Sequence, residues 1–589
     1  MPHLGDFHVS PRVTALAALA VPVGAACALV AVVLLKLIAL VTNLCFHASL
    51  SFSATTPGST PHRWLIAVMP VTGGLAIGLM ARYGSEKIRG HGMPEAIEAI
   101  LVGGSKVQPR VAVLKPLSAA ISIGSGGPFG AEGPIIMTGG AVGSILAQFL
   151  TVTADERKTL LVAGSAAGMA ATFNSPLAAI LLAVELLLFE WRPRSYIPVA
   201  AATVTATVVR GPLLGTGPLF GGSHVPAHLS LPVYPLCVVA GIVAGLLALA
   251  ATALVYLSED LFAKLPIHWM WWPAIGGAII GAGGLIEPRA LGVGYDVIGQ
   301  LLTGRAGTGL IIGILVIKTL IWGLALGSGT SGGVLAPMFM IGGALGATEA
   351  LVFPTVSPGF WALISLAGVL GGVMRSPLTG IVFCLELTHE TNAILPMIIT
   401  ASTAYLLSVT WLKRSVLTEK IARRGLHLTR EYSVDPLETH LVRDTEPQPT
   451  IALPETVGVA QALATVASAH GTTPEPPVRL FPVVDDAGRV RGAVTRGDLA
   501  AATGKELLRD LARPAITATG GETLRTVANR MAVHHVTSIL ILDAAGAADG
   551  VLTLRQLLAA RRIDAHEEHH AERVMAIRLP RRTRTEPAG

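Results

Sequence analysis

The residues best suited to chemistry lie in a glycine-rich run, GSGGPFGAEGPIIMTGGAVG at 124–143, which holds a single carboxylate, Glu132. Apolar segments flank this run on both sides. Within a membrane, backbone that breaks helical hydrogen bonding is tolerated only where protein buries it or where it lines a cavity. Pro134 suits the first turn of a helix, so a helix is expected to begin near Glu132. The free N–H groups and positive dipole end of that helix predict an anion site.

Two further runs have the same character: GHGMPEAIEAI at 90–100 and GSGTSGGVLAPMFMIGGALG at 327–346. The third run repeats the first at an offset of 203, since Pro134, Met137, Gly139, Gly140, Ala141 and Gly143 return as Pro337, Met340, Gly342, Gly343, Ala344 and Gly346. SPLAAILLAVEL from Ser175 likewise matches SPLTGIVFCLEL from Ser376. Interrupted segments at matching places in two halves indicate a transporter site at the repeat interface, near the bilayer midplane. The residues alone leave open whether the halves are inverted.

The elements that must position these runs are membrane helices. Of the 589 residues, 52% are hydrophobic and 14% charged, whereas about a quarter are charged in soluble domains. Apolar segments are expected at 13–50, 64–80, 111–123, 160–188, 197–209, 235–257, 270–286, 310–326 and 360–412. The first is too long for a signal peptide and is expected to remain as an anchor. Several are shorter than 20 residues, which predicts tilted and half-crossing helices.

Charge and cysteine usage exclude other classes. The net charge of +6 comes largely from Arg and Lys at the ends of spans, as the positive-inside tendency predicts, so no nucleic-acid partner is expected. The four cysteines stand singly in apolar spans, which indicates packing rather than a metal site or a disulfide.

From about residue 426 the composition becomes soluble, and a second repeat follows. Asp485, Gly488, Gly492 and Thr495 recur 58 residues later. Each unit predicts a strand, a glycine turn, a short strand and a helix, so the tail is expected to be a paired α/β module. HEEHH at 566–570 has histidines at helical spacing, which could bind a metal, although a solvated charged helix is favoured. The expected domains are 1–430 in the membrane, 431–505 and 506–565 for the repeats, and 566–589 as a charged tail.

Taken in order, the motifs resemble those of one family. GHGMPE is similar to GSGIPE, GAEGP to GREGP and GGVLAP to GGIFAP of the CLC family of chloride channels and chloride/proton exchangers, and the likeness covers residue 13 to the end. The soluble repeat resembles a pair of CBS domains. The resemblance implies a multi-span α-helical membrane protein with an inverted repeat and broken helices, plus a soluble α/β CBS pair. It also implies a homodimer with a pore in each subunit, in the plasma (inner) membrane, multi-pass, with both termini cytoplasmic.

The resemblance assigns roles to the broken helices. Glu132 resembles the gating glutamate, whose carboxylate occupies the outer anion site and leaves when protonated. The backbone N–H groups of Val334 and Leu335, in the turn with Gly333, resemble those that hold a central chloride, and those of Ala131 and Glu132 resemble the outer site. Physically, a carboxylate at a helix N-terminus competes with an anion, and protonation removes its charge. The simpler interpretation of Glu132 is a first-turn acid that stabilises its own helix. The simpler interpretation of the glycines, such as those at 342–346, is that they allow close helix packing.

Three departures from the family pattern stand out. His91, beside Gly92, replaces a serine whose hydroxyl binds chloride, and Leu417 replaces a tyrosine that closes the inner mouth. Anion binding would then rest mainly on backbone amides, with His91 able to donate an N–H unless it faces away from the pathway. Leu186 stands where many exchangers carry a second, proton-transferring glutamate, so channel and exchanger both stay open. Glu185 and its repeat Glu386 are interpreted as structural acids.

In the soluble tail, GAVTRGD resembles the CBS pattern that holds a nucleotide ribose through Thr495 and Asp498, while the second unit has Gln556 in place of that aspartate. One hypothesis is that this unit binds an adenine nucleotide. The other is that the two CBS domains are purely structural. No other cofactor is expected. The expected substrate is chloride, together with protons if the protein is an exchanger. The lipid bilayer is the expected surroundings. One alternative is a transporter of another anion without proton coupling. A cation transporter would need converging acids in the broken helices, which the sequence lacks. A membrane enzyme is not expected.

Overall fold

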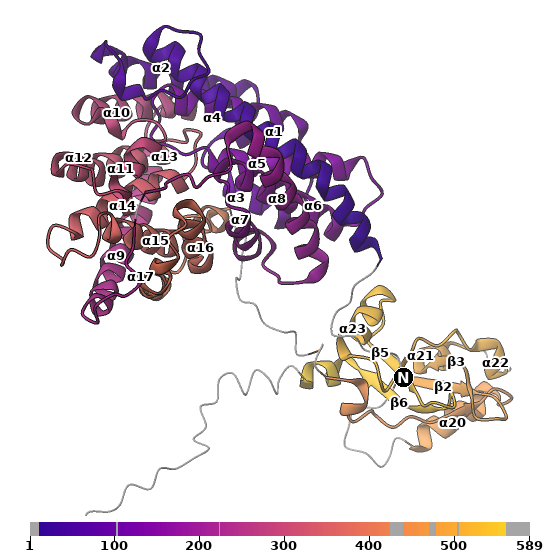
Figure 1. Ribbon diagram of the computed structural model, residues 1–589. Coiled ribbons are helices and arrows are strands. Elements are labelled where there is room, and N and C mark those ends of the chain that lie inside the picture. The colour runs from indigo at the N-terminus through magenta and orange to yellow at the C-terminus, as the bar shows by residue number, and fades with distance from the viewer. Residues whose placement is uncertain are drawn as a thin grey trace, which may run out of the picture. The chain divides into compact units, whose positions relative to one another are not determined.

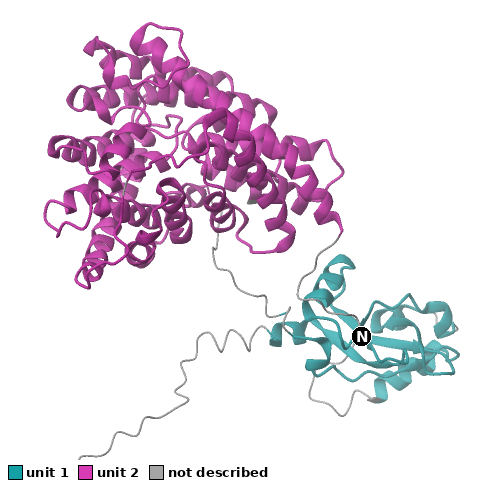
Figure 2. Cartoon of the chain, viewed as in Figure 1, with its two compact units in different colours: residues 1–6, 433–589 teal, residues 7–432 magenta. Residues whose placement is uncertain are grey.

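The structure is a computed structural model that describes residues 11–101, 104–222, 224–424, 437, 440–469, 479–502 and 506–560. The chain divides into two compact units, residues 7–432 and residues 1–6 with 433–589 (Figure 2). HEEHH and the rest of the charged tail lie outside the described residues. Among those described, seven helices are long and apolar enough to cross a membrane.

The larger unit is entirely helical where it is described (Figure 1). Its first half contains α1 (Arg12–His47), α2 (Arg63–Tyr83), α3 (Met93–Leu101), α4 (Pro109–Gly124), α5 (Glu132–Gln148), α6 (Ala154–Phe173), α7 (Pro176–Leu182), the π-helix η3 (Ala183–Leu188) and α8 (Pro193–Leu214). Its second half contains α9 (Val233–Ala263), α10 (Trp272–Ile286), α11 (Tyr295–Leu302), α12 (Thr308–Gly313), the π-helix η6 (Ile314–Lys318), α13 (Thr319–Gly327), α14 (Leu335–Glu349), α15 (Phe360–Met374), α16 (Pro377–Thr388), α17 (Ile394–Trp411) and α18 (Glu419–Arg423). Short 3₁₀ turns join several of these helices.

The internal repeat of the sequence is a repeat of packing. In the first half α5 packs on α6 and α6 on α8; in the second half α14 packs on α15 and α15 on α17. The two halves meet at the breaks before α5 and α14, where Gly130 and Gly333 pair in opposite chain directions. The predicted helix start near Glu132 is confirmed, as is the long first span, which is one continuous helix with Pro22 inside it.

Glycines let the repeated helices approach closely. A Cβ built on Gly139 of α5 would overlap the carbonyl oxygen of Gly164 in α6, and one on Gly164 would overlap that of Gly139. In the second half, a Cβ on Gly346 would overlap the carbonyl oxygen of Trp361. Small residues allow such contact between membrane helices, where van der Waals packing drives association. The packing role considered for the glycines at 342–346 is therefore confirmed for Gly346.

The smaller unit contains two three-stranded sheets in the order β1-β2-β3 and β4-β5-β6. Its elements are β1 (Leu453–Pro454), α20 (Val459–Ala469), β2 (Leu480–Val484), β3 (Val490–Thr495), α21 (Arg496–Ala501), α22 (Leu508–Leu511), β4 (Thr517–Thr519), α23 (Leu524–Val533), β5 (Ser538–Leu542) and β6 (Ala548–Thr553). In each sheet the first strand is parallel to the second, and the second is antiparallel to the third. The paired hairpins predicted from the repeat are confirmed, whereas the parallel strands β1 and β4 were not predicted.

The repeated Asp and Gly of this unit form the hairpin turns. The Asp485 carboxylate accepts from the N–H groups of Ala487 and Arg489 at 3.0 and 2.9 Å, and Asp543 makes the equivalent bonds. Gly488 has φ +75°, a conformation that glycine adopts without strain. Turn chemistry therefore accounts for this part of the repeat.

Candidate functional site

The Glu132 carboxylate lies where the N-termini of α5 and α14 converge. Its side chain is fully buried, and it lies against the Cα positions of Gly130 and Gly333, where an added Cβ would collide with it. It faces the N–H groups of Glu132 itself and of Ala336 in α14. Neither carboxylate oxygen has a hydrogen-bond partner of standard geometry among the described residues. We call the space bounded by Gly130, Gly333 and these two N–H groups the anion seat, because it presents the amide ends of two helices to a negative charge.

Backbone hydrogen bonds between the glycine-rich runs build this seat. The Gly130 N–H donates to the Gly333 carbonyl at 3.2 Å, and the Gly333 N–H donates to the Gly130 carbonyl at 2.7 Å. The Gly90 N–H donates to the Thr330 carbonyl at 3.0 Å, which ties in the third run. A Cβ at Gly133 would overlap the His91 carbonyl, so glycine is required at that approach. The three runs that the sequence singled out therefore come together.

The predicted anion-binding residues of these runs share one buried neighbourhood. Ala131, Val334 and Leu335 are at most 4% exposed. Ala131 and Val334 are the residues that immediately precede α5 and α14, so their N–H groups belong to the unpaired helix ends. Gly92 has φ +82° and packs against the Gly133 carbonyl.

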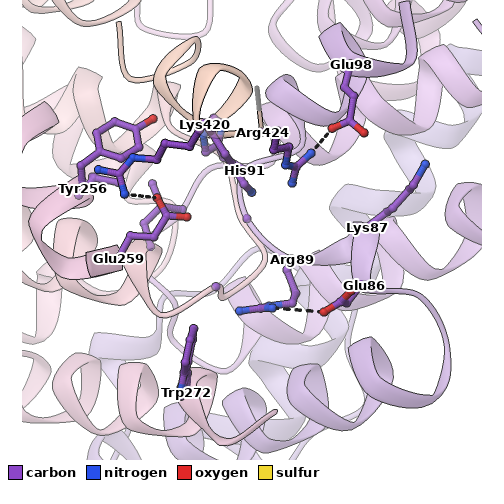
Figure 3. A pocket seen from close by; sticks show the side chains of 16 residues that line it. Glu86, Lys87, Arg89, His91, Glu98, Tyr256, Glu259, Trp272, Lys420 and Arg424 are labelled. Atoms are coloured by element: carbon purple, nitrogen blue, oxygen red, sulfur yellow. Dashed lines mark hydrogen bonds and ion pairs between the residues drawn. The ribbon is translucent and has the colours of Figure 1, made fainter. Parts of the chain in front are cut away.

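His91 is 5% exposed, and its Nδ1 has no hydrogen-bond partner in the described part of the chain. It lies at the wall of a cavity of about 490 Å³ (Figure 3). His91 therefore borders an open space in the described part of the chain. Its ring could donate an N–H into the cavity.

The cavity carries a surplus of positive charge. Five basic side chains and three acidic ones line it: Lys87, Arg89, Lys420, Arg423, Arg424, Glu86, Glu98 and Glu259. Figure 3 shows Arg424 paired with Glu98 and Arg89 with Glu86. A cleft lined with an excess of one charge concentrates ions of the opposite sign, so this cavity favours small anions.

Leu417 is buried and is not among the cavity-lining residues of the described chain. The segment around it is held by neighbouring residues, since the Tyr256 hydroxyl donates to the Val416 carbonyl. In α18, Lys420 pairs with the buried Glu95 of α3 at 2.8 Å. The structure therefore places Leu417 in the core beside the cavity, without a side-chain donor.

Two buried lysines near the breaks were missed in the sequence. Lys115 of α4 and Lys318 of η6 are fully buried. The Lys115 ammonium donates to the carbonyls of Ile88 and Gly90 at 2.8 and 2.7 Å. Lys318 donates in the same way to two carbonyls of the loop before α11, at 2.8 and 2.7 Å. Their offset of 203, the same as that of Pro134 and Pro337, was the sequence feature that could have revealed them.

Glu185 and Glu386 each cap a helix in the opposite half. Glu185 accepts from the Thr379 N–H at 2.9 Å at the start of α16. Glu386 accepts from the N–H groups of Leu177 and Ala178 at 2.9 and 2.8 Å at the start of α7. Carboxylates stabilise helix N-termini through such bonds, so the interpretation of both as structural acids agrees with their contacts.

In the smaller unit, Thr495 and Asp498 form the N-terminal cap of α21. The Thr495 hydroxyl donates to Asp498 at 2.6 Å and accepts from the Asp498 N–H at 3.1 Å. These hydrogen bonds hold the pKa of Asp498 below its usual value. Gln556 accepts from the Thr553 N–H at 2.8 Å in the second repeat, so it performs the same cap there. The Asp498 side chain remains 21% exposed.

The letters GTSGG at 329–333 fit the G-x-S-x-G spacing of hydrolase nucleophiles, and HEEHH fits H-E-x-x-H. Ser331 lies in the break between α13 and α14 rather than on a strand-to-helix turn, and its Oγ is 3.0 Å from that of Ser118. The described residues contain no group of three metal-ligating side chains. The GTSGG match therefore gives no support to an enzyme, and HEEHH lies outside the described residues.

Comparison with known proteins identifies both units. The family described as "Voltage gated chloride channel" matches residues 73–409, and CBS domains match residues 444–504 and 508–562. The H(+)/Cl(-) exchange transporter ClcA of Salmonella paratyphi A is 34% identical over 346 residues, which cover 54% of this chain and 70% of that protein. The homologue in Salmonella newport is 33% identical over the same length.

Solved structures show the same fold. A slow cyanobacterial Cl⁻/H⁺ antiporter aligns with a TM-score of 0.62 and 21% identity, over 71% of this chain and 99% of that one. A eukaryotic CLC transporter aligns with a TM-score of 0.56 and 19% identity, over 92% of this chain and 97% of that one. The predicted fold, a multi-span helical protein with repeated halves and broken helices followed by an α/β pair of CBS domains, is confirmed.

Proposed function

We propose that this chain carries chloride or a similar small anion across the bilayer. The premise is that the chain belongs to the voltage gated chloride channel family and is an integral membrane protein. The observation that carries the proposal is the buried Glu132 carboxylate in the anion seat, which occupies the meeting point of two helix N-termini. Such helix ends bind anions through free N–H groups and their dipoles.

Protonation of Glu132 is the proposed gating step. A neutral carboxyl group loses the attraction that holds it against two helix dipoles, so it leaves the seat and an anion takes its place. The N–H groups of Ala131 and Glu132 then bind the anion on one side, and those of Val334 and Leu335 bind a second anion farther along. His91 donates an N–H from the cavity, with Gly92 and Gly333 allowing the close backbone approach.

Fixed charges support the anion along this route. The cavity's surplus of basic side chains collects anions at the mouth, and Lys115 and Lys318 place positive charge beside the breaks without a directly bonded carboxylate to neutralise it. Ionisable groups buried at membrane depth usually mark an ion pathway.

Two modes of transport are supported by different observations. The curated relatives named above are H(+)/Cl(-) exchange transporters, which favours coupled movement of protons through Glu132. Leu186, a buried leucine where a second acid would stand, favours anion flux without coupling. We propose exchange, with water carrying protons to Glu132 in the absence of an acid at 186.

The remaining proposals concern assembly and regulation. The family is typically homodimeric, and we propose a homodimer in the plasma (inner) membrane with both termini cytoplasmic. Thr495 and Asp498 would hold the ribose of an adenine nucleotide, since Asp498 is partly exposed and its Oδ1 lies outside the cap, 3.4 Å from the exposed Arg513 guanidinium. The second repeat, with Gln556, would be structural.

The test is purified full-length protein in liposomes loaded with chloride, read with external chloride and pH electrodes together. Proton uptake in fixed ratio to chloride loss is the expected result. Glu132→Ala should abolish proton coupling and leave anion flux that no longer depends on pH. Glu349→Gln is the matched control, since Glu349 is a buried acid bound to Ser365 at 2.5 Å, outside the proposed route. Absence of chloride flux from the native protein, or intact coupling in Glu132→Ala, would reject the proposal.

A further inference from the structure

The hydroxyl of Tyr295 is a buried polar group that the proposed cycle leaves unused. Tyr295 is the first residue of α11, and its Oη has neither solvent contact nor a hydrogen-bond partner in the described part of the chain. Glu132 is the acid whose charge acts on this hydroxyl, and its own oxygens face the N–H groups of Glu132 and Ala336 without a hydrogen bond of standard geometry. Buried polar groups in native structures are almost always paired, so the unpaired Tyr295 hydroxyl beside this acid requires an explanation.

The tyrosine ring is held in place by aromatic neighbours. Phe173 at the end of α6 meets it edge to face with ring centroids 6.3 Å apart, and Phe220 meets it at 6.0 Å. Phe173 in turn contacts Phe339 of α14 and Phe383 of α16. Because four segments enclose this cluster, the hydroxyl cannot swing away to find a partner elsewhere.

The backbone that leads into Tyr295 is equally fixed. Lys318 binds the carbonyls of Ala290 and Gly292, and the Gly292 N–H donates to the Gly126 carbonyl at 3.3 Å. Gly294 has φ +78°, and a Cβ there would collide with Met340 of α14, the helix beside α11 (Figure 1). Any partner must therefore come to the hydroxyl.

The moving group in the proposed cycle is the Glu132 carboxyl. An anion in the seat would replace the carboxylate oxygens, and these oxygens make no hydrogen bond with Tyr295 from their present position. The carboxyl group that has left the seat is the one nearby polar group that the proposed cycle sets free to come to the hydroxyl.

We propose that Tyr295 is a positioning residue that receives the Glu132 carboxyl group when it leaves the anion seat, by a hydrogen bond between the phenolic hydroxyl and the released group. The inference rests on the proposed function, in which Glu132 moves. The bond stabilises the released state and not the seated one, so it favours anion flux. It supplies a side-chain hydroxyl in a chain whose positions 91 and 417 have none.

Other charges around these groups are the same before and after loss of the hydroxyl. Lys318 faces Glu132 and also Asp296, the residue after Tyr295. In the first half, His91, Glu95 and Lys115 act on one another. Tyr295→Phe removes one oxygen atom and changes none of these charges, so its effect reports the hydroxyl alone.

The experiment measures chloride efflux from proteoliposomes between pH 4 and 8 for the native protein and Tyr295→Phe, with Tyr196→Phe as control. Tyr196 stacks on Trp191, away from the seat. Loss of one hydrogen bond should weaken the released state about fivefold and move the midpoint about 0.7 pH units lower. At the native half-maximal pH the released fraction then falls from about one half to about one sixth, so efflux should drop about threefold. The control should keep the native midpoint. The thermal midpoint of Tyr295→Phe should not fall, because the hydroxyl is unpaired in the seated state.

The Glu132→Ala background separates the possible failures. In that background Tyr295→Phe should have no further effect on efflux. An additional loss there would show that the hydroxyl binds the anion and would overturn the inference, as would an unchanged midpoint or one shifted to higher pH in the single variant. Failure of Glu132→Ala itself to remove the pH dependence would instead reject the proposed function.

Discussion

Replacing the buried lysine of η6 tests whether fixed charge holds the anion and the breaks together. Lys318→Met keeps the length of the side chain but removes its charge and its bonds to the Ala290 and Gly292 carbonyls at 2.8 and 2.7 Å. Each buried carbonyl left unpaired costs about 1–3 kcal/mol, so the free energy of unfolding should fall by about 2–6 kcal/mol.

The same change should weaken anion binding. The Lys318 charge acts on Glu132 in the seat. At an effective dielectric constant of about 20, a unit charge stabilises an anion by about 1 kcal/mol even at a separation of roughly 15 Å, so at least about a fivefold change in Kd is expected. Calorimetric titration of detergent-purified protein with chloride measures the affinity, and thermal unfolding measures the stability. Lys115→Met should behave in the same way, because Lys115 makes the equivalent bonds in the first half.

Lys36→Met is the matched control for both variants. Lys36 also donates to a backbone carbonyl, that of Phe52 at 3.4 Å, but it is exposed. Chloride affinity in Lys318→Met equal to that of the native protein would refute the assignment of fixed charge to the anion route. Lost affinity in Lys36→Met would show that the assay reports a general loss of folding.

Two further predictions concern packing and the smaller unit. Gly139→Val should destabilise the protein by at least about 3 kcal/mol in thermal unfolding, because its side chain would overlap the Gly164 carbonyl. Gly309→Val is the control, since an added side chain there has nothing within 4 Å, and it should not destabilise the protein. Equal effects of the two variants would contradict the packing argument. Asp498→Ala should remove binding of adenosine triphosphate by the full-length protein in equilibrium dialysis, and unchanged binding would reject that site. Because the folded-state pKa of Asp498 is lowered, its contribution to stability should be present above about pH 4 and be lost as the pH falls through the lowered value; a pH-independent difference between the native protein and Asp498→Ala below pH 4 would contradict this.

Much of the site could be predicted because its features are local in sequence. Pro134 and Pro337 mark helix starts, and the structure begins α5 and α14 at Glu132 and Leu335. The offset of 203 between them predicted that the breaks correspond. Convergence on a single seat followed from the scarcity of places where a membrane protein tolerates broken helices.

Other features depend on contacts between distant segments and could not be predicted from local patterns. Glu185 and Glu386 were interpreted as structural acids, but the helices they cap lie 194 and about 209 residues away in the chain. The strand β1 is two residues long and is defined by its pairing with β2, so periodicity gave no sign of it. The buried lysines lie inside the expected spans 111–123 and 310–326, and they were overlooked because the basic residues were attributed to the ends of spans.

The central claim is that Glu132 and the transported anion compete for one seat. Crystals of the native protein and of Glu132→Ala, grown at neutral pH in bromide, would locate the anion by its anomalous scattering. We expect a bromide peak between Gly130 and Gly333, beside the Ala336 N–H, in Glu132→Ala, and the carboxylate without bromide at that place in the native protein. A peak there with the native carboxylate still in place, or no peak in the variant, would contradict the account.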